Sequence, residues 1–549
     1  MELLRSKKFV FIAAVVMLCV YIVPLGSYPL MEPDEGRYAE IPREMIESGN
    51  YITPMLNYVK YFEKPAFLYH INAVAFKVLG ENEFAARIGT ALCAVGGALA
   101  TAALAAFIYG RAAGIIAGFV TATSLLYFAI GTINITDMPL SFFMTVAFAA
   151  FYVAHRKDDK KYYLLFYLSC AMALLTKGLI GIVLPGAVIF FYILATKQWK
   201  LFYKPLYIPG IILFFAVSVP WFYMVCRDNP DFFRFFFIQE HFLRYATKMH
   251  GRYEPFWFFL PMIPAGLLPW TAFLSALFSK KSVLRSPHTD EEKLGGIYLI
   301  FWFSVILIFF SFSSSKLIPY IVPCLPPLAV LIGGDAARMI NDRSWHGFVL
   351  PALFVTTWLL GLTLLIYPNF SEYVTFARVW HISLKAGLAL IAMPLLALYF
   401  TRRGRKDFEK AICSLIVCAI FFIWGLQGIY GIVASERTMK YVAEVIMKDV
   451  RSDDTLVSYN EVLQGLSFYT GRRVAVVGDG GELSYGASCP EGKGWFFSEE
   501  EFEKMWLDGD KDYIVVIEND GRFDSLSDKF RSGIKRRIDL GKYSILYNR

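Results

Sequence analysis

Long apolar runs fill most of the chain up to about residue 434. A bilayer-spanning helix needs about 17 to 25 mainly apolar residues, and runs of that length recur between short polar connections. The expected spans are 9–26, 83–108, 113–130, 138–154, 162–178, 180–196, 206–226, 257–278, 295–312, 317–334, 347–367, 382–400 and 411–433. The pattern therefore predicts a polytopic α-helical membrane protein with about thirteen transmembrane helices.

Beyond residue 434 the pattern changes. Apolar runs shorten to strand length in TLVSYN, RRVAVVG, DYIVVIEN and YSILYN, and helical stretches such as MKYVAEVIMKDV lie between them. Strands that alternate with helices are typical of an α/β domain. We expect a transmembrane domain of residues 1–434, with outward loops 27–82 and 227–256, and a small soluble α/β domain of residues 435–549. The tail has no GxxxxGK loop, so we expect no nucleotide cofactor.

Composition supports the membrane class. Hydrophobic residues make up 56% of the chain and charged residues 18%, and the mean hydropathy is +0.48. The formal net charge is +8, but the basic residues gather in alternate short loops such as Arg402–Lys406, where they act as topology signals. We therefore expect no nucleic-acid partner, and we place the basic loops in the cytoplasm. The loops 27–82 and 227–256 and the tail then face outward.

Polar residues gather in MEPDEGRYAEIPREMIESGNYITPMLNYVKYFEKP, which lies in the first outward loop. Further polar residues stand at other outward helix ends. If these ends converge, they form a cationic, aromatic-walled cavity at the level of the lipid headgroups, which suits a lipid-linked phosphate. The candidates are Asp34, Glu35, Arg37, Tyr38, Tyr58, Tyr61, Glu63 and Lys64 in the first loop, Asp137, Lys316 and Tyr320 at helix ends, and His241, Arg244, Lys248 and Arg252 in the loop 227–256.

Several segments carry a family resemblance. DEGRYAEIPREMIESGNYITPMLN, YFEKP, ITDMPLSFF, EHFLRY and KLIPYIVPCLPPLA resemble the bacterial lipid A 4-amino-4-deoxy-L-arabinose transferases, which are C-type glycosyltransferases related to the protein O-mannosyltransferases. The resemblance implies inverting transfer of that sugar from undecaprenyl phosphate to a lipid A phosphate. It also implies a multi-pass protein of the bacterial inner membrane, among membrane lipids, with its active site facing the periplasm. Another sugar or acceptor, as in an O-mannosyltransferase or a galacturonosyltransferase, and a lipid-linked sugar transporter remain alternatives.

Residue roles follow from the chemistry of such a donor. The leaving group is a lipid phosphate, so cations are needed where its charge develops. Lys64 and Arg244 lead for that role, ahead of Lys248 and Arg252. We expect Arg37, Tyr38, Tyr58, Tyr61, Lys316 and Tyr320 to contact the substrates, and Asp34, Glu35 and Asp137 to be catalytic. Asp34 acts as a base if the acceptor is a hydroxyl and positions the sugar if the acceptor is a phosphate, and the sequence leaves that choice open.

A metal site is a further hypothesis. Glu63 and His241 could share a divalent ion such as zinc if their two loops meet, and the resemblance supports that pairing. We expect such an ion to be structural, and a simple ion pair of Glu63 is the alternative. Cysteine does not contribute, because seven of the eight cysteines lie in or beside apolar spans.

Overall fold

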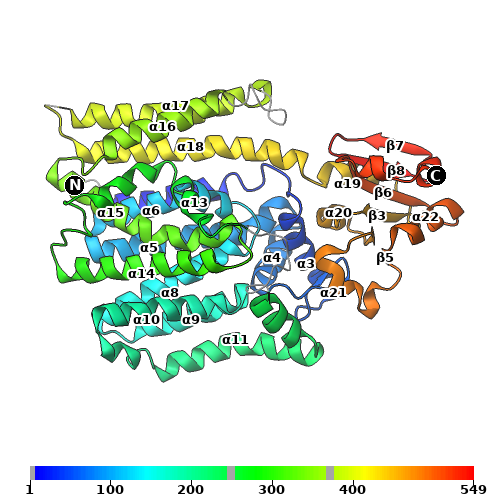
Figure 1. Cartoon of the computed structure of the whole chain (residues 1–549), viewed down its shortest axis with the longest axis horizontal. Coiled ribbons are helices and arrows are strands. Elements are labelled where there is room, and N and C mark those ends of the chain that lie inside the picture. The colour runs from blue at the N-terminus through cyan, green and yellow to red at the C-terminus, as the bar shows by residue number, and fades with distance from the viewer. Residues whose placement is uncertain (1–6, 244–253, 367–375, 403) are drawn as a thin grey trace. The chain divides into compact units, whose positions relative to one another are not determined.

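The computed structural model describes residues 7–243, 254–366, 376–402 and 404–549 (Figure 1). The chain divides into two compact units. Unit 1 comprises Met1–Leu25, Thr90–Met224 and Phe233–Tyr430, and unit 2 comprises Gly26–Gly89, Val225–Phe232 and Gly431–Arg549. Unit 2 thus joins three segments that are far apart in the sequence. The predicted division into residues 1–434 and 435–549 stays a prediction.

Unit 1 consists of helices, drawn from blue through cyan and green to yellow in Figure 1. Three of its helices, α5, α11 and α18, have one end in unit 2. The elements are α2 (Lys7–Ile22), α5 (Glu83–Tyr109), α6 (Arg111–Thr123), α7 (Leu125–Gly131), α8 (Asp137–Lys157), α9 (Lys161–Lys177), α10 (Ile180–Thr196), η1 (Trp199–Phe202), α11 (Ile208–Asp228), η2 (Arg234–Leu243), α13 (Phe259–Gly266), η3 (Trp270–Phe278), α14 (Asp290–Phe312), η4 (Ile318–Cys324), α15 (Leu325–Asp342), α16 (Val349–Ile366), α17 (Phe376–Thr401) and α18 (Phe408–Glu436).

The helices account for the apolar runs of the sequence. Each of the thirteen predicted ranges holds a helix or a bent pair of helices. Within the described residues, eight helices are long and apolar enough to cross a membrane, or up to ten if the pairs α6 and α7 (bent by 65°) and α13 and η3 (bent by 113°) each count as one span. The chain is therefore a polytopic membrane protein, and thirteen crossings stay a prediction.

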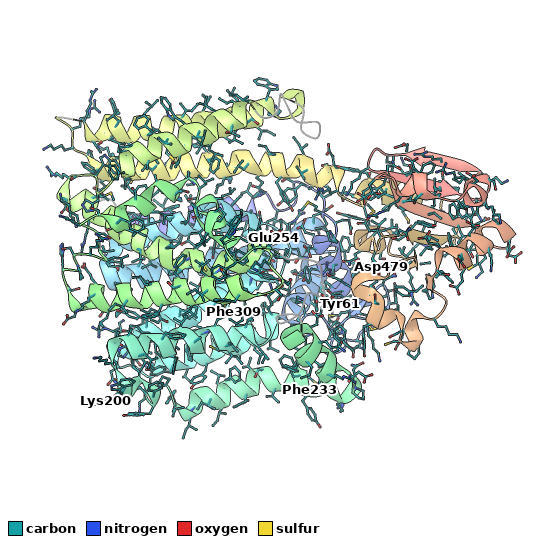
Figure 2. All side chains as sticks on the ribbon, in the orientation of Figure 1. Tyr61, Lys200, Phe233, Glu254, Phe309 and Asp479 are labelled. Atoms are coloured by element: carbon teal, nitrogen blue, oxygen red, sulfur yellow. The ribbon has the colours of Figure 1, made fainter. Side chains whose placement is uncertain are left out.

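Small residues bring helices of unit 1 close together. A Cβ added at Gly333 of α15 would lie 2.5 Å from the carbonyl oxygen of Ala113 in α6, so only glycine permits this approach. Such contacts are typical of helices packed in a membrane, where van der Waals packing drives association. Outer helices instead leave apolar side chains exposed, as at Phe215 and Val355. Lys200, labelled in Figure 2, lies in η1 within one of the basic loops.

Unit 2 contains a six-stranded mixed sheet in the order β5-β4-β3-β6-β8-β7, drawn in orange and red in Figure 1. Strands β5, β4, β3 and β6 are parallel, and β8 and β7 are antiparallel. The elements of unit 2 are α3 (Asp34–Ser48), β1 (Met55–Leu56), β2 (Val59–Lys60), α4 (Phe67–Leu79), α19 (Lys440–Asp449), β3 (Thr455–Tyr459), α20 (Gln464–Thr470), β4 (Val474–Val477), η6 (Gly481–Leu483), α21 (Ser484–Ala487), η7 (Pro490–Gly492), β5 (Phe496–Phe497), α22 (Glu499–Asp508), β6 (Tyr513–Glu518), α23 (Arg522–Ser525), α24 (Asp528–Ser532), β7 (Arg536–Asp539) and β8 (Tyr543–Tyr547).

Helices cover both faces of this sheet. Successive strand residues point to opposite faces, so Ile514 and Val516 of β6 pack with α19 and α20, whereas Val515 and Ile517 pack with α22 and α24. Burial on both faces explains why the central strands are continuously apolar. Strands occupy all four of the short apolar runs noted in the sequence.

The first loop and the tail are joined inside unit 2 by a backbone-to-backbone contact. A Cβ added at Gly36 of α3 would lie 2.6 Å from the backbone nitrogen of Gly465 in α20, so neither helix tolerates a side chain here. Glu32 reinforces the contact, since its carboxylate accepts hydrogen bonds from the backbone N–H groups of Gln464 (3.1 Å) and Gly465 (2.6 Å). Burial raises the pKa of Glu32 to about 8, although these two N–H groups act in the opposite direction.

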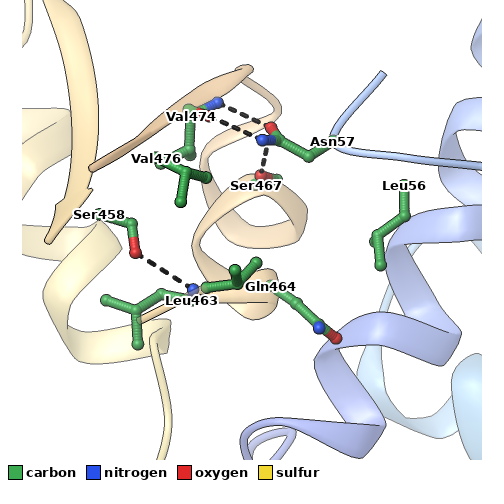
Figure 3. Close-up of a pocket in the computed structure, with 9 residues that line it drawn as sticks. Leu56, Asn57, Ser458, Leu463, Gln464, Ser467, Val474 and Val476 are labelled. Atoms are coloured by element: carbon green, nitrogen blue, oxygen red, sulfur yellow. Dashed lines mark hydrogen bonds between the residues drawn. The ribbon is translucent and has the colours of Figure 1, made fainter. Parts of the chain in front are cut away.

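A second junction lies at the β1–β2 hairpin. Asn57 and Tyr58 occupy its two-residue turn with φ of 54° and 60°, as a type I′ turn requires. The Asn57 amide then pairs with the edge of β4: Nδ2 donates to the Val474 carbonyl (2.7 Å) and Oδ1 accepts from the Val474 N–H (2.9 Å). Figure 3 shows these bonds at a small pocket that Leu56, Asn57 and residues of the tail line.

Candidate functional site

Helix α3 begins at Asp34, and its first turn carries an exposed carboxylate above a buried guanidinium. A negative charge is favoured there because the helix dipole is positive at its N-terminus. The Asp34 side chain is 58% exposed, and its Oδ1 pairs with Nη2 of Arg37 at 3.2 Å. Within the described residues, the other oxygen, Oδ2, has no hydrogen bond or ion pair.

Arg37 is the centre of this site. Its guanidinium is buried and donates in four directions: Nε to Oε1 of Gln464 (3.0 Å), Nη1 to the Tyr61 hydroxyl (3.2 Å) and to Glu482 (2.5 Å), and Nη2 to Asp34. The Tyr61 hydroxyl also donates to Glu482 at 3.2 Å. Figure 2 labels Tyr61 and Asp479, which precedes the short helix of Glu482. The predicted substrate contact of Arg37 stays a prediction, but four protein groups already engage this side chain.

Glu35 differs sharply from its neighbour Asp34. Its carboxylate is buried and forms a two-pronged ion pair with Arg87 at the start of α5, with distances of 2.7 and 2.8 Å. Arg87 also donates to the carbonyls of Tyr28 and Pro29. A catalytic role for Glu35 is untested, and the geometry favours a structural one, because both of its oxygens are engaged by one buried cation.

The inner face of α3 carries further buried charges. Arg43 pairs with Glu40 through two bonds of 2.7 Å and donates to the Tyr58 hydroxyl, which itself donates to Glu47. Burial raises the pKa of both Glu40 and Glu44, and the repulsion between the two carboxyls raises that of Glu44 further. Tyr58, predicted to contact a substrate, is thus held in a network of protein groups.

Three further predicted residues of the first loop follow each other closely. Tyr61 is buried, and burial raises its pKa while the Arg37 cation lowers it. Glu63 is buried as well, and the Lys64 ammonium lies 3.7 Å from its carboxylate and 3.0 Å from its backbone carbonyl. Lys64 keeps partial exposure, which suits a group that meets a substrate. Tyr38 is buried and stacks on Tyr69.

The predicted residues Asp137, Lys316 and Tyr320 belong to unit 1. Asp137 is the first residue of α8 and pairs with Lys177 in the last turn of α9, at 2.5 Å. The Lys177 ammonium also lies 4.7 Å from the centre of the Tyr320 ring in η4. Lys316 is buried and donates to the carbonyls of Glu254 (2.9 Å) and Ser313 (2.6 Å). The ends of α8, α9 and η4 therefore lie together within unit 1, and a single cavity that also includes the first loop stays a prediction.

Part of the predicted site lies outside the described residues. These are Arg244, Lys248 and Arg252, together with the side chain of His241. In the described part of the chain, no group of three or more His, Cys, Asp and Glu side chains could hold a metal ion. Glu63 supplies one buried carboxylate, so the proposed pair with His241 stays untested.

Sequence reasoning missed three residues. Arg87 is a charged residue near the start of an otherwise apolar run, and that position was an available signal of a buried partner. Glu482 had no such signal, because the glycine-rich segment GDGGEL that contains it predicts only a turn. Nothing in the sequence around Gln464 pointed to Arg37 either. Their contacts with Arg37 depend on folding across more than four hundred residues.

Comparison with known proteins agrees with this architecture. The family model described as dolichyl-phosphate-mannose-protein mannosyltransferase matches residues 6–236, and the one described as aminoarabinose transferase C-terminal domain matches residues 442–530. The crystal structure of ArnT from Cupriavidus metallidurans bound to undecaprenyl phosphate superposes with a TM-score of 0.84 at 27% identity, over 99% of this chain and 98% of that one. The fold is thus that of a membrane-embedded glycosyltransferase.

Two curated relatives define the family. The undecaprenyl phosphate-alpha-4-amino-4-deoxy-L-arabinose arabinosyl transferase 1 of Proteus mirabilis (strain HI4320) is 32% identical over 503 residues, which cover 88% of each chain. The enzyme of that name from Edwardsiella ictaluri (strain 93-146) is 30% identical over 558 residues, which cover 93% of this chain and 94% of the relative. The chain belongs to the family of undecaprenyl phosphate-α-4-amino-4-deoxy-L-arabinose arabinosyl transferases.

Proposed function

We propose that this protein transfers 4-amino-4-deoxy-L-arabinose from undecaprenyl phosphate to a phosphate of lipid A, with inversion at the anomeric carbon. The names of the relatives support the sugar and the carrier, and the Cupriavidus metallidurans structure with bound undecaprenyl phosphate supports the lipid phosphate. The acceptor rests on the resemblance alone.

One observation carries the proposal. The inner charges of α3 are buried and paired, whereas Asp34 stands 58% exposed with one oxygen free of protein partners in the described chain. Asp34 is held by the buried guanidinium through Oδ1, so its Oδ2 is available to a substrate. Lys64, in the same unit and partly exposed, supplies a cation for the phosphate of the donor.

The reaction divides the work between these residues. The bond between the anomeric carbon and the lipid phosphate oxygen breaks, and a lipid A phosphate oxygen forms the new bond to that carbon from the opposite face. Lys64 stabilises the charge that develops on the departing lipid phosphate. An acceptor phosphate is already anionic at neutral pH, so Asp34 positions the sugar, whose amino group is cationic, and removes no proton. Arg37 fixes Asp34 for this task.

We place the protein in the bacterial inner membrane with thirteen crossings and with the site and the α/β tail in the periplasm. The composition of unit 2 supports this topology. Its three segments, 26–89, 225–232 and 431–549, consist of parts of the chain that the positive-inside rule predicts to face outward, together with the adjoining ends of the predicted spans. Segments on opposite sides of a membrane could not pack into one unit.

A divalent ion at Glu63 and His241 is a further part of the proposal. Glu63 fits the role of one ligand, because its carboxylate is buried next to Lys64 in the first loop. A structural zinc site has about four protein ligands and keeps no position open for a substrate. Such an ion would stabilise the loop and take no part in the reaction.

The test is a defined transfer assay. The purified protein in lipid nanodiscs receives synthetic undecaprenyl phosphate-aminoarabinose and lipid A, and mass spectrometry follows both lipids. We expect lipid A to gain one aminoarabinose, with free undecaprenyl phosphate as the second product, and Asp34→Asn to lower the rate of this gain about a thousandfold. Undecaprenyl phosphate-galacturonic acid and a serine-containing peptide serve as the alternative donor and acceptor. Transfer only with either of these, or an intact donor throughout, would contradict the proposal.

A further inference from the structure

The C-terminal tail reaches the proposed site through Arg37. Two of the four groups that engage the guanidinium, Gln464 and Glu482, belong to the tail, more than four hundred residues away in sequence. They bind Nε and Nη1 of Arg37, which are the positions of the guanidinium that Asp34 does not use. The tail therefore sets the orientation of the Arg37 guanidinium relative to Asp34.

Gln464 is held firmly in this arrangement. It is the first residue of α20, its backbone N–H is bound by the Glu32 carboxylate, and the next residue, Gly465, abuts the backbone of Gly36. Its side chain is buried. The amide oxygen therefore points at Arg37 Nε from a position that the docking of two helices determines.

Glu482 supplies the charge. Its carboxylate lies 2.5 Å from Arg37 Nη1 and accepts from Tyr61, so it is the shortest contact of the guanidinium. Without it, Arg37 could turn and bind both oxygens of Asp34, since a guanidinium and a carboxylate pair most strongly through two parallel bonds. With it, only Nη2 reaches Asp34, and Oδ2 stays available.

We propose that Glu482 and Gln464 are positioning residues of the transfer reaction: the tail holds Arg37 so that Asp34 keeps one oxygen for the substrate. This inference rests on the proposed function, because it assigns Asp34 a role in transfer. It gives the tail a part in turnover, beyond a docking or structural appendage.

The test compares two ion pairs between the tail and the first loop. Glu482→Gln keeps the shape of the side chain and removes its charge. Glu491→Gln is the matched control, because Glu491 in η7 pairs with Lys60 at 3.9 Å in the same hairpin region, and neither residue is bonded to Arg37 or Asp34. Transfer kinetics with varied donor, and the thermal midpoint of each purified variant, are measured in the same nanodiscs.

We expect Glu482→Gln to lower kcat about tenfold or more, in the range of coupled neighbours, with the KM for the donor unchanged within about twofold and the thermal midpoint close to that of the control. Gln464→Met, which removes the acceptor of the Nε bond, should lower kcat in the same way and serves if Glu482→Gln folds poorly. An unchanged kcat in both variants, or a raised KM at constant kcat, would overturn the inference.

A double variant separates this inference from the proposed function. If Glu482 acts through Asp34, then Glu482→Gln should cause no further loss in an Asp34→Asn background, measured on the residual transfer. A full and independent loss in that background overturns the positioning role. If Asp34→Asn alone retains normal transfer, the role of Asp34 fails first, whatever Glu482→Gln does.

Discussion

Among the helices that begin with an aspartate, α3 and α8 place this residue in contrasting surroundings. Asp34 opens α3 in unit 2, and Asp137 opens α8 in unit 1. Each pairs with a cation, but Asp34 is 58% exposed and contacts Arg37 at 3.2 Å, whereas Asp137 is 12% exposed and contacts Lys177 at 2.5 Å. An aspartate in the first turn of a helix is therefore an available carboxylate at Asp34 and part of a closed ion pair at Asp137.

The partner explains the difference. The guanidinium of Arg37 also donates to Glu482, Tyr61 and Gln464. Only one of its nitrogens, Nη2, therefore contacts Asp34. Lys177 has one carboxylate partner and one aromatic ring, Tyr320. A compact ammonium with a single anion forms a tight pair, whereas a planar fork can distribute its bonds. What surrounds the cation thus decides whether the aspartate is left for a substrate.

The largest expected effect comes from Asp34→Asn, which tests the open side of the comparison. Loss of the charge that positions the substrate should lower transfer about a thousandfold, or about 4 kcal/mol. The thermal midpoint should stay near the wild-type value, because the exposed side chain contributes little to stability. Measured in the nanodisc assay, near-normal transfer by this variant would remove Asp34 from the reaction.

Lys64 extends the comparison to the cations. If it holds the phosphate of the donor, Lys64→Ala should lower transfer about a hundredfold, or about 2.7 kcal/mol, and Lys64→Arg should recover little, because a planar fork does not replace a compact ammonium. Lys77→Ala is the control, since Lys77 lies over the ring of Tyr51 in the same unit, 4.8 Å from its centre. A fully active, well-expressed Lys64→Arg variant would favour an interfacial anchor over a phosphate contact.

The contrast between the two aspartates was not visible in the sequence. The helical segments followed from apolar length alone, and four of the six strands of the sheet followed from short apolar runs, because burial leaves both patterns in the sequence. Both Asp34 and Asp137 stand in polar segments next to apolar ones, and the sequence predicted a catalytic role for each. Their difference depends on Glu482 and Gln464, which only tertiary packing brings to Arg37. The same limit applies to Glu35, whose partner Arg87 lies in another helix.

The closed pair in unit 1 should behave as a unit. Removing one member, in Asp137→Asn or Lys177→Met, leaves the other charge poorly solvated and should lower the free energy of unfolding by about 2 kcal/mol, less than for a fully buried pair because both side chains keep some exposure. The double variant should recover part of this loss. The exposed pair of Asp158 and Lys204 provides the control, and Asp158→Asn should cost under about 0.5 kcal/mol. Thermal midpoints of the five proteins decide it, and purely additive losses would contradict a coupled pair.

The smallest expected effect concerns Glu44 on the inner face of α3. Unlike the exposed Asp34, Glu44 is a buried carboxyl beside another acid, Glu40. Its pKa is raised by burial and then by repulsion from Glu40, whereas the N–H of Tyr58, which donates to Oε2 at 3.0 Å, acts in the other direction. The folded protein therefore holds a proton that the unfolded chain releases above pH 4 to 5, roughly. By linkage, the contribution of Glu44 to stability is complete at low pH and is lost as the pH rises toward the folded-state pKa.

Glu44→Gln tests this sign directly. The amide has the shape of the protonated carboxyl: its oxygen can accept from Tyr58 and its NH₂ can donate to Glu40. We expect the variant to match the wild type near pH 5 and to be more stable by about 1 kcal/mol at pH 8, because it loses no proton. The control is Glu47→Gln on the exposed side of α3, which should change stability by under about 0.5 kcal/mol at either pH. A Glu44→Gln variant that is less stable than the wild type at pH 8 would contradict this prediction, because it would mean that Glu44 is ionised in the folded protein. Helix α3 would then carry a second charged carboxylate besides Asp34 that a substrate could use.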